Sequence, residues 1–152
     1  GFEMSFTGEY INLVDQKHRL SIPAKFRNAL GSDNDKTFVL SKGFDECLLL
    51  YPLNEWKIVE EQLSSLSSIK DRHRNFIRNI VRHANYVRYD SQGRIAMPDL
   101  LLNYANIKKE VLVIGMLKKI ELWEPSTLSK HEKQKDFLSD EDFEDLANEI
   151  NF

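Results

Sequence analysis

DQKHRLSIP, residues 15–23, and DSQGRIAMP, residues 90–98, are two versions of one motif, and they decide how the rest of the chain is interpreted. In both versions Asp, Arg, an aliphatic residue, a second apolar residue and Pro recur in the same order, at a constant offset of 75 residues. An internal repeat is sought before any other feature, because missing it leads to the wrong fold. The motif therefore predicts two related structural units in one chain.

The repeat continues downstream of each motif. The apolar run that ends at Gly43 is matched by the run that ends at Gly115, and Leu48–Tyr51 is matched by Ile120–Trp123, now at an offset of 72. The first copy has a polar loop that is longer by three residues. A unit of about 45 residues buries little apolar surface when it is alone, so we expect the two copies to pack together around one core.

Residue patterning predicts the same local structure in both copies. In the first copy, a strand over residues 10–14, a polar turn over 15–18 and a second strand over 19–22 indicate a β-hairpin. Pro23 ends the second strand and suits the first turn of a short helix over residues 24–30. A Gly-centred hairpin of two apolar strands completes the unit. The second copy repeats this plan, with strands over residues 86–89 and 94–97 and a helix over 99–104.

Further helices are predicted between and after the copies. Apolar residues at helical spacing indicate helices over residues 54–66 and 68–85. Near the end of the chain, Ser139 and Asp142 form a capping-box pattern that begins a last helix. We expect that helix to dock its apolar side on the body of the protein or on a neighbouring subunit.

These elements divide the chain into parts. We expect a scar from an expression vector at residues 1–3 with a natural start at Met4, a first unit at 7–54, inter-unit helices at 55–82, a second unit at 83–126 and an acidic helical tail at 127–152.

Composition restricts the class of protein. With 41% hydrophobic and 30% charged residues the chain is typical of soluble globular proteins, and no apolar run approaches the length of a membrane span. The single cysteine, Cys47, cannot form an intrachain disulfide, which favours a cytoplasmic location. The net charge of −3 conceals a division, because residues 124–152 hold three lysines against nine acidic residues, which leaves +3 for the remainder. A basic body with an acidic tail is compatible with binding to phosphates.

The repeated motif contains a pair of residues with distinct chemistry. Asp15 and Asp90 can accept hydrogen bonds from the backbone of their own turns, while Arg19 and Arg94 project from the following strand. An arginine fork can bond the O6/N7 edge of guanine or grip phosphate oxygens. The alternative is a surface ion pair across the turn, worth about 0–1 kcal/mol. Recurrence at matched positions favours a shared function.

Together with FTGEY at residues 6–10 and LLLYPLNEW at residues 48–56, the two motifs resemble the MraZ family of bacterial transcriptional regulators over residues 6–128. The resemblance implies an α+β fold in which tandem SpoVT/AbrB-type swapped-hairpin units form a pseudo-dimeric β-barrel with flanking helices. It also implies a homo-oligomeric ring that binds double-stranded DNA at short direct repeats. The expected function is control, usually repression, of the protein's own cell-division and cell-wall operon, at the nucleoid.

The resemblance also assigns candidate site residues. The DNA-binding set is Lys17, Arg19, Lys25, Arg27, Gln92 and Arg94, and the turn-shaping set is Asp15, His18, Asp90 and Gly93. His18 departs from the family, which favours glycine at that position, so a positive φ there would be strained or the turn would differ. The first motif has the richer basic surroundings, so we expect Arg19 to dominate DNA contact and Arg94 mainly to complete the barrel.

Other interpretations remain open. The row Lys70, Arg74, Arg78 and Arg82 could track phosphates, could be a solvated face, or could meet acidic groups such as the tail of another subunit. The rival function is an AbrB-type interaction scaffold or antitoxin-like protein whose acidic terminal helix grips a partner. No enzyme, metal site or cofactor is expected, because the sequence has no zinc spacing, phosphate loop or nucleophile elbow, and Cys47 suits a buried core position. Control by a metal or small-molecule signal stays open.

Overall fold

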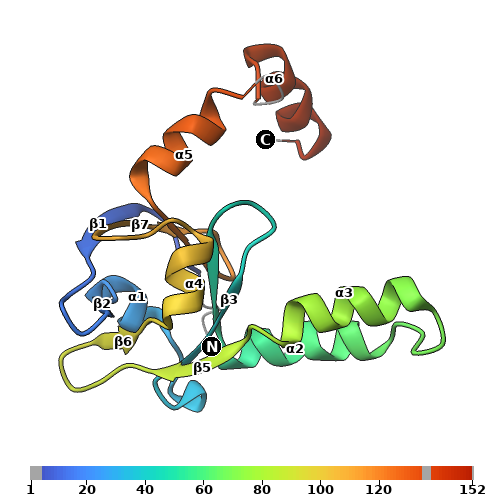
Figure 1. Ribbon diagram of the computed structural model, residues 1–152. Helices are drawn as coiled ribbons and strands as arrows, with labels where there is room; N and C mark the ends of the chain where they lie inside the picture. Colours follow the sequence, from blue (N-terminus) through green and yellow to red (C-terminus); the bar gives the residue numbers. More distant parts are fainter. Residues whose placement is uncertain (1–4, 135–137, 152) are drawn as a thin grey trace.

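Antiparallel strands arranged in two sheets, with helices around them, make up the computed structural model, which describes residues 5–134 and 138–151 (Figure 1). The expected vector scar at residues 1–3 and the start at Met4 lie outside the described residues. The fold class is α+β, as predicted from the sequence.

The larger sheet interleaves strands of the two copies. Its order is β1 (Glu9–Leu13), β7 (Glu110–Gly115), β8 (Ile120–Trp123), β4 (Leu48–Pro52), β3 (Thr37–Lys42) and β5 (Asn85–Arg88). The first strand of each copy thus pairs with the other copy, β1 with β7 and β5 with β3, while β4 and β8 join the two Gly-centred hairpins. The first strand of each copy therefore needs the other copy as its pairing partner. Buried residues of both copies form one hydrophobic cluster, which confirms the expectation of one shared core.

The smaller sheet corrects the predicted hairpins. Strand β2 (Arg19–Ser21) pairs with β6 (Arg94–Ala96) of the other copy and forms no ladder with β1. The links across the motif turn include an isolated bridge between Val14 and Leu20, a hydrogen bond from the Asp15 backbone N–H to Arg19 O, and one from the Asn12 side-chain amide to Ser21 O. The prediction that the two strands flanking each motif turn pair with one another was therefore wrong, although the turns themselves are formed. Pairing across the copies sets Leu20 opposite Ile95 and buries both side chains completely. Sequence periodicity predicts which side chains of a strand point toward the core, but not which other strand it pairs with.

Short helices follow the motif prolines as predicted. Helix α1 (Ala24–Ala29) and helix α4 (Asp99–Tyr104) begin directly after Pro23 and Pro98, and a 3-10 turn, η1 (Ser32–Asn34), lies in the longer loop of the first copy. The ring of Phe26 on α1 is fully buried and meets Phe6 and Tyr10 edge-on, with ring centroids 5.5 and 5.4 Å away. These contacts anchor α1 beside the N-terminal segment.

Helices α2 (Leu53–Ser64) and α3 (Asp71–Val81) form a pair that extends from the body (Figure 1). The prediction of one helix over residues 68–85 was too long at both ends. At its C-terminal end, Asn85 already belongs to β5, opposite Leu40. Sheet pairing overrides the apolar helical pattern there. None of the residues of α3 is buried, so its apolar side is only partly covered.

Two helices follow the sheet. Helix α5 (Pro125–Glu132), absent from the sequence prediction, begins where the Glu124 side chain accepts hydrogen bonds from the backbone N–H groups of Ser126 and Thr127. Helix α6 (Asp140–Glu149) begins with the predicted capping box of Ser139 and Asp142. Of the two places where α6 was expected to dock, its own body is contradicted, since its apolar side chains are exposed and Figure 1 shows it apart from the sheets; docking on a neighbouring subunit stays a prediction. Within the described ranges, no helix is long and apolar enough to cross a membrane.

Candidate nucleic-acid interface

The two motif arginines share one face of the small sheet. In the β2–β6 register Arg19 lies opposite Ala96, and Arg94 lies opposite Ser21. Alternation along each strand turns Leu20 and Ile95 toward the core, so Arg19 and Arg94 both face outward. Residues on such a diagonal are about 7–8 Å apart, which lets both side chains reach one ligand surface. The structure thus brings together two residues that are far apart in the sequence.

Each motif turn is closed by its aspartate. In the first motif the Asp15 carboxylate accepts hydrogen bonds from the backbone N–H of Arg19 at 2.8 Å and of Lys17 at 2.9 Å, and from Arg19 Nε at 2.9 Å. The second motif repeats this geometry. There Asp90 accepts from the backbone of Arg94 and Gln92 and from Arg94 Nε, at 2.9–3.0 Å. The turn-shaping role predicted for the aspartates agrees with this geometry.

These hydrogen bonds fix the ionisation of the carboxylates. The backbone N–H of Arg19 and, in the other turn, that of Arg94 are the largest influences that lower the pKa of Asp15 and Asp90 below the ordinary value. A carboxylate that stays charged keeps its hold on the Nε atom of the arginine. The aspartate therefore orients the guanidinium group and leaves the Nη edge pointing away from the turn.

The two arginines are not equally available. Both Nη groups of Arg19 are without a hydrogen-bonding partner among the described residues. By contrast, Arg94 Nη1 also lies 4.0 Å from Asp15 Oδ2, which ties it to both turns. The side chain of Arg94 is 23% exposed against 31% for Arg19. Arg19 is thus the more accessible of the two in this structure; that it dominates DNA contact stays a prediction.

His18 occupies the position that requires a positive φ. Its φ is +57°, and the equivalent Gly93 has a φ of +78°. The backbone is otherwise the same in both turns, because Met97 N donates to His18 O and Ile22 N donates to Gly93 O, each at 2.8 Å. The turn has not changed, so the histidine accepts the strain. Its ring also lies with Nδ1 2.5 Å from Asp99 Oδ1, a contact that no sequence pattern predicted.

We expect His18→Gly to be more stable than His18→Ala by about 1 kcal/mol, because only alanine must hold a Cβ in the left-handed region. Both variants lack the imidazole, so the loss of the Asp99 contact cancels in the comparison. Urea unfolding followed by circular dichroism measures the difference. Equal stabilities would show that the positive φ at this position costs nothing.

The remaining candidates differ in their surroundings. Lys17 and Gln92 are exposed beside the arginines at the tips of the turns. Lys25 is exposed as well, and its Nζ donates to the carbonyl of Thr7 at 3.2 Å. All three side chains are exposed, and the contact of Lys25 with Thr7 places its amino group beside the N-terminal segment.

Arg27 has a structural contact that sequence reasoning missed. Its Nε donates to Ile22 O at 2.9 Å, and its guanidinium lies 5.9 Å from the centre of the Tyr89 ring. A Cβ on Gly93 would come within 2.5 Å of Arg27 Nε. The arginine of the first copy therefore packs against the turn of the second, and a side chain at residue 93 would displace the Arg27 guanidinium in addition to the strain of the positive φ. The one hint in the sequence was that the second motif has a glycine, Gly93, where the first motif has His18.

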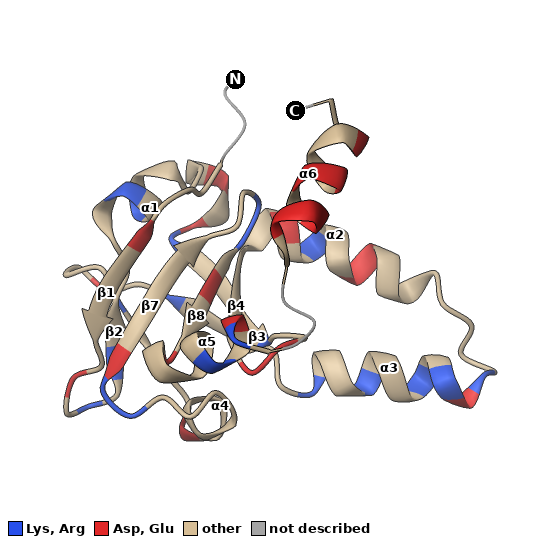
Figure 2. Ribbon diagram, turned by 90° about the horizontal axis from the view of Figure 1, so that it is seen from above, with Lys and Arg blue, Asp and Glu red and all other residues tan. Residues whose placement is uncertain are grey.

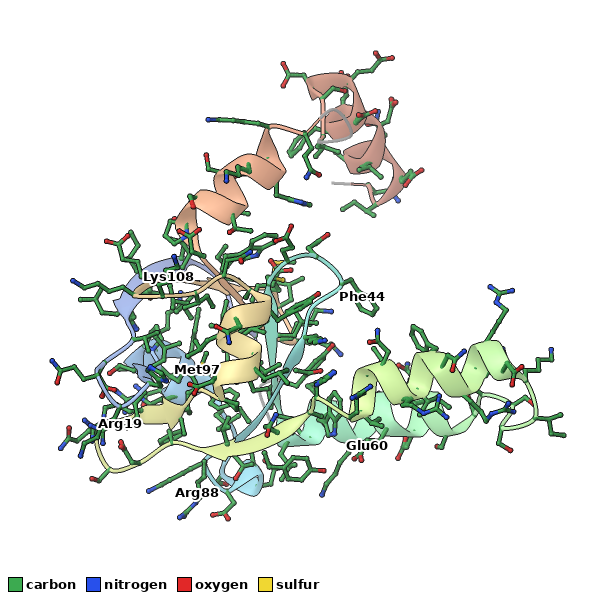
Figure 3. The ribbon with its side chains drawn as sticks, viewed as in Figure 1. Arg19, Phe44, Glu60, Arg88, Met97 and Lys108 are labelled. Atoms are coloured by element: carbon green, nitrogen blue, oxygen red, sulfur yellow. The ribbon has the colours of Figure 1, made fainter. Side chains whose placement is uncertain are left out.

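The basic row on α3 lies away from this face. Figures 2 and 3 place α3 on the opposite side of the molecule from β2 and Arg19, so the row and the motif arginines form no continuous surface. Arg74 is also engaged locally, with Nη1 donating to the carbonyls of Ser68 and Ile69 and Nη2 bonded to Asp71. Part of the row therefore holds the turn between α2 and α3.

Cys47 is in the core, as predicted. The residue is 1% exposed, and burial raises the pKa of its thiol to about 12, which suppresses thiolate chemistry. In the part of the chain that the structure describes, no cluster of three or more His, Cys, Asp or Glu side chains is placed to hold a metal ion.

Comparison with known proteins finds the same family twice along the chain, once in each copy of the repeat. A family model described as "MraZ protein, putative antitoxin-like" matches residues 5–79 and again 80–149. A protein of Clostridium acetobutylicum named "Transcriptional regulator MraZ" is 47% identical over 118 residues, which cover 78% of this chain and 80% of that protein. Proteins of the same name from Clostridium tetani and Pediococcus pentosaceus are 40% and 37% identical over 145 residues, covering 95% of this chain and 96% of each relative.

Proposed function

The chain belongs to the MraZ family of transcriptional regulators, and from this premise we propose that it binds double-stranded DNA in a sequence-specific manner through the β2–β6 face. The observation that supports the proposal is the pair of outward-facing arginines, each held through Nε by its own aspartate. Held in this way, the Nη edge is oriented before DNA arrives, which reduces the entropy lost on binding. Lys17, Gln92 and Lys25 would add contacts to phosphates or base edges around them.

The proposal has a regulatory part. The protein would bind short direct repeats upstream of its own cell-division and cell-wall operon, act there as a repressor, and associate with the nucleoid. One protomer presents few contacts, so useful affinity requires several protomers on successive repeats. We infer for this reason a homo-oligomeric ring.

We further infer that the two sheets are parts of one swapped-hairpin barrel, a pseudo-dimer within a single chain. The exchange of β1 and β5 between copies and the β2–β6 pairing support this arrangement. The structural units would then be residues 7–54 and 83–126, with the helices of 55–82 and the acidic tail of 127–152 outside them.

We expect the protein to bind a labelled duplex from upstream of its own gene more tightly than a scrambled duplex of equal length. An assembly that makes six to ten phosphate contacts should lose about 10³- to 10⁵-fold in affinity between 50 and 200 mM salt, because bound counterions are released. Fluorescence anisotropy over a salt series measures both quantities. Equal affinity for the two duplexes would contradict specific recognition.

A second candidate is an antitoxin-like interaction scaffold. The exposed apolar side of α6 and the match to a family described as antitoxin-like favour it. In that case deletion of residues 134–152 would abolish the main interaction, while a change at Arg19 would leave it intact. The DNA-binding proposal predicts the reverse for the upstream duplex.

A further inference from the structure

An open apolar groove of about 840 Å³ lies between the α2–α3 pair, the β3–β4 hairpin and the turn that connects β7 to β8. Large apolar side chains line it and remain exposed, namely Phe44 (75%), Ile58 (47%), Phe76 (43%), Met116 (43%) and Leu117 (62%). Figure 3 shows Phe44 on the β3–β4 loop, on the side that faces α3. A contiguous apolar patch of this kind marks an interaction site.

The charged residues that line the groove are mostly basic. Its lining includes Lys42, Lys118 and Lys119 but only one acidic residue, Glu55. An apolar occupant that carries negative charge on its flanks would therefore fit this site best.

Helix α6 has those properties. Phe143, Leu146, Ala147 and Ile150 stand at positions i, i+3, i+4 and i+7, which place them within about 100° on one side of the helix. The three larger side chains are 61%, 50% and 71% exposed, in the order of the chain. The remainder of the helix has six acidic residues and no basic one. Figure 2 shows the acidic residues of α6 in red. A short amphipathic helix seated in an apolar groove is a common recognition mode.

We propose that α6 of one protein chain docks in the α2–α3 groove of a second copy. The chain's own α6 contributes no residue to the groove, and Figure 1 shows it separated from α2 and α3. Each copy would donate one helix and accept another. A head-to-tail contact of this type uses two different surfaces, so it closes into a ring when its rotation permits. The contact involves neither Arg19 nor Arg94, so the experiments below test it without measuring DNA binding.

Cysteine pairs test the docking directly. The native Cys47 is buried, so introduced cysteines on the surface are the reactive thiols. Full-length Leu146→Cys and Met116→Cys chains, tagged differently, are co-expressed and oxidised with copper phenanthroline. We expect a disulfide between the two tagged chains, seen as a doubled apparent mass on a non-reducing gel. The matched control pairs Leu146→Cys with Ile69→Cys, because Ile69 is 87% exposed and lies outside the groove.

Equal crosslinking of the control pair would overturn the proposal, as would no crosslink in either pair. A single chain that carries both Leu146→Cys and Met116→Cys and forms only an intrachain disulfide would assign the helix to its own groove instead. A second variant avoids thiol chemistry. Phe143→Ser with Leu146→Ser, which changes only exposed residues, should reduce the mass of the assembly in light scattering, whereas Ile69→Ser should not. An unchanged mass for the double variant would also count against the docking.

Discussion

Arg19→Ala is expected to weaken binding to the upstream duplex by at least about 100-fold, because each bidentate arginine contact contributes about 1–3 kcal/mol and several protomers lose it at once. The aspartate that holds Arg19 Nε would then have no guanidinium to orient, and the outward Nη edge would be lost. Fluorescence anisotropy at fixed salt measures the change. The effect should exceed that of Arg94→Ala, since Arg94 is already tied to two carboxylates.

The matched control is Lys108→Ala, which removes the same charge from another part of the surface (Figure 3). A loss of similar size for Lys108→Ala would mean that binding depends on net charge and not on the β2–β6 face. Arg19→Lys separates charge from geometry, because lysine keeps the charge but lacks the planar fork. We expect Arg19→Lys to retain binding to scrambled DNA and to lose preference for the upstream duplex. Thermal unfolding of each variant shows whether the turn survives.

Gly115→Ala is expected to destabilise the fold by about 1–3 kcal/mol, the range typical of an added methyl group that forces the backbone to shift. A Cβ at residue 115 would come within 2.4 Å of Thr7 N and 2.5 Å of Phe6 C, and these are backbone atoms that cannot rotate away. The N-terminal segment would have to move off the sheet. That movement would break the two hydrogen bonds between Phe6 and Leu117 and would expose the buried Phe6 ring.

Gly31→Ala is the control for that substitution. Gly31 has a φ of −62° and a ψ of 151°, a conformation that alanine adopts without strain, so this change should be neutral or slightly stabilising. Urea unfolding of both variants gives the two free energies. If Gly115→Ala is as stable as Gly31→Ala, the close approach of residues 6 and 7 to β7 is not a constraint on the fold.

Local chemistry explains what the sequence could predict. Turn closure by Asp15 and Asp90, the helices after Pro23 and Pro98, and the capping box at Ser139 all depend on residues a few positions apart. The repeat also predicted a shared core, because a unit of about 45 residues buries too little apolar surface on its own. These features follow from hydrogen bonding and steric preference within one turn of chain, and such preferences can be read directly from the residues.

Long-range pairing explains what the sequence could not predict. Alternation showed which faces of residues 19–22 are apolar, yet an intracopy hairpin and the observed β2–β6 pair satisfy that alternation equally well. For the same reason the contact of Arg27 with Gly93 escaped prediction, since it joins residues of different copies. Within the candidate site, the hydrogen bonds from the turn backbone to Asp15 and Asp90 agree with the prediction from the sequence. The contacts of Arg27 with the second turn and of His18 with Asp99 were not predicted.

The unequal turns at His18 and Gly93 give the molecule a direction. A dimer of identical chains has an exact twofold axis and reads inverted sequences, because each half presents the same surface. Here the two halves are joined in one chain and have diverged, so rotation about the axis between β2 and β6 exchanges a histidine with a glycine and a free arginine with a tethered one. If the protein binds DNA as proposed, such a protomer would present two distinguishable ends to the duplex. Successive protomers in one orientation would then bind direct repeats of one short sequence. An inverted repeat would give them no additional contacts.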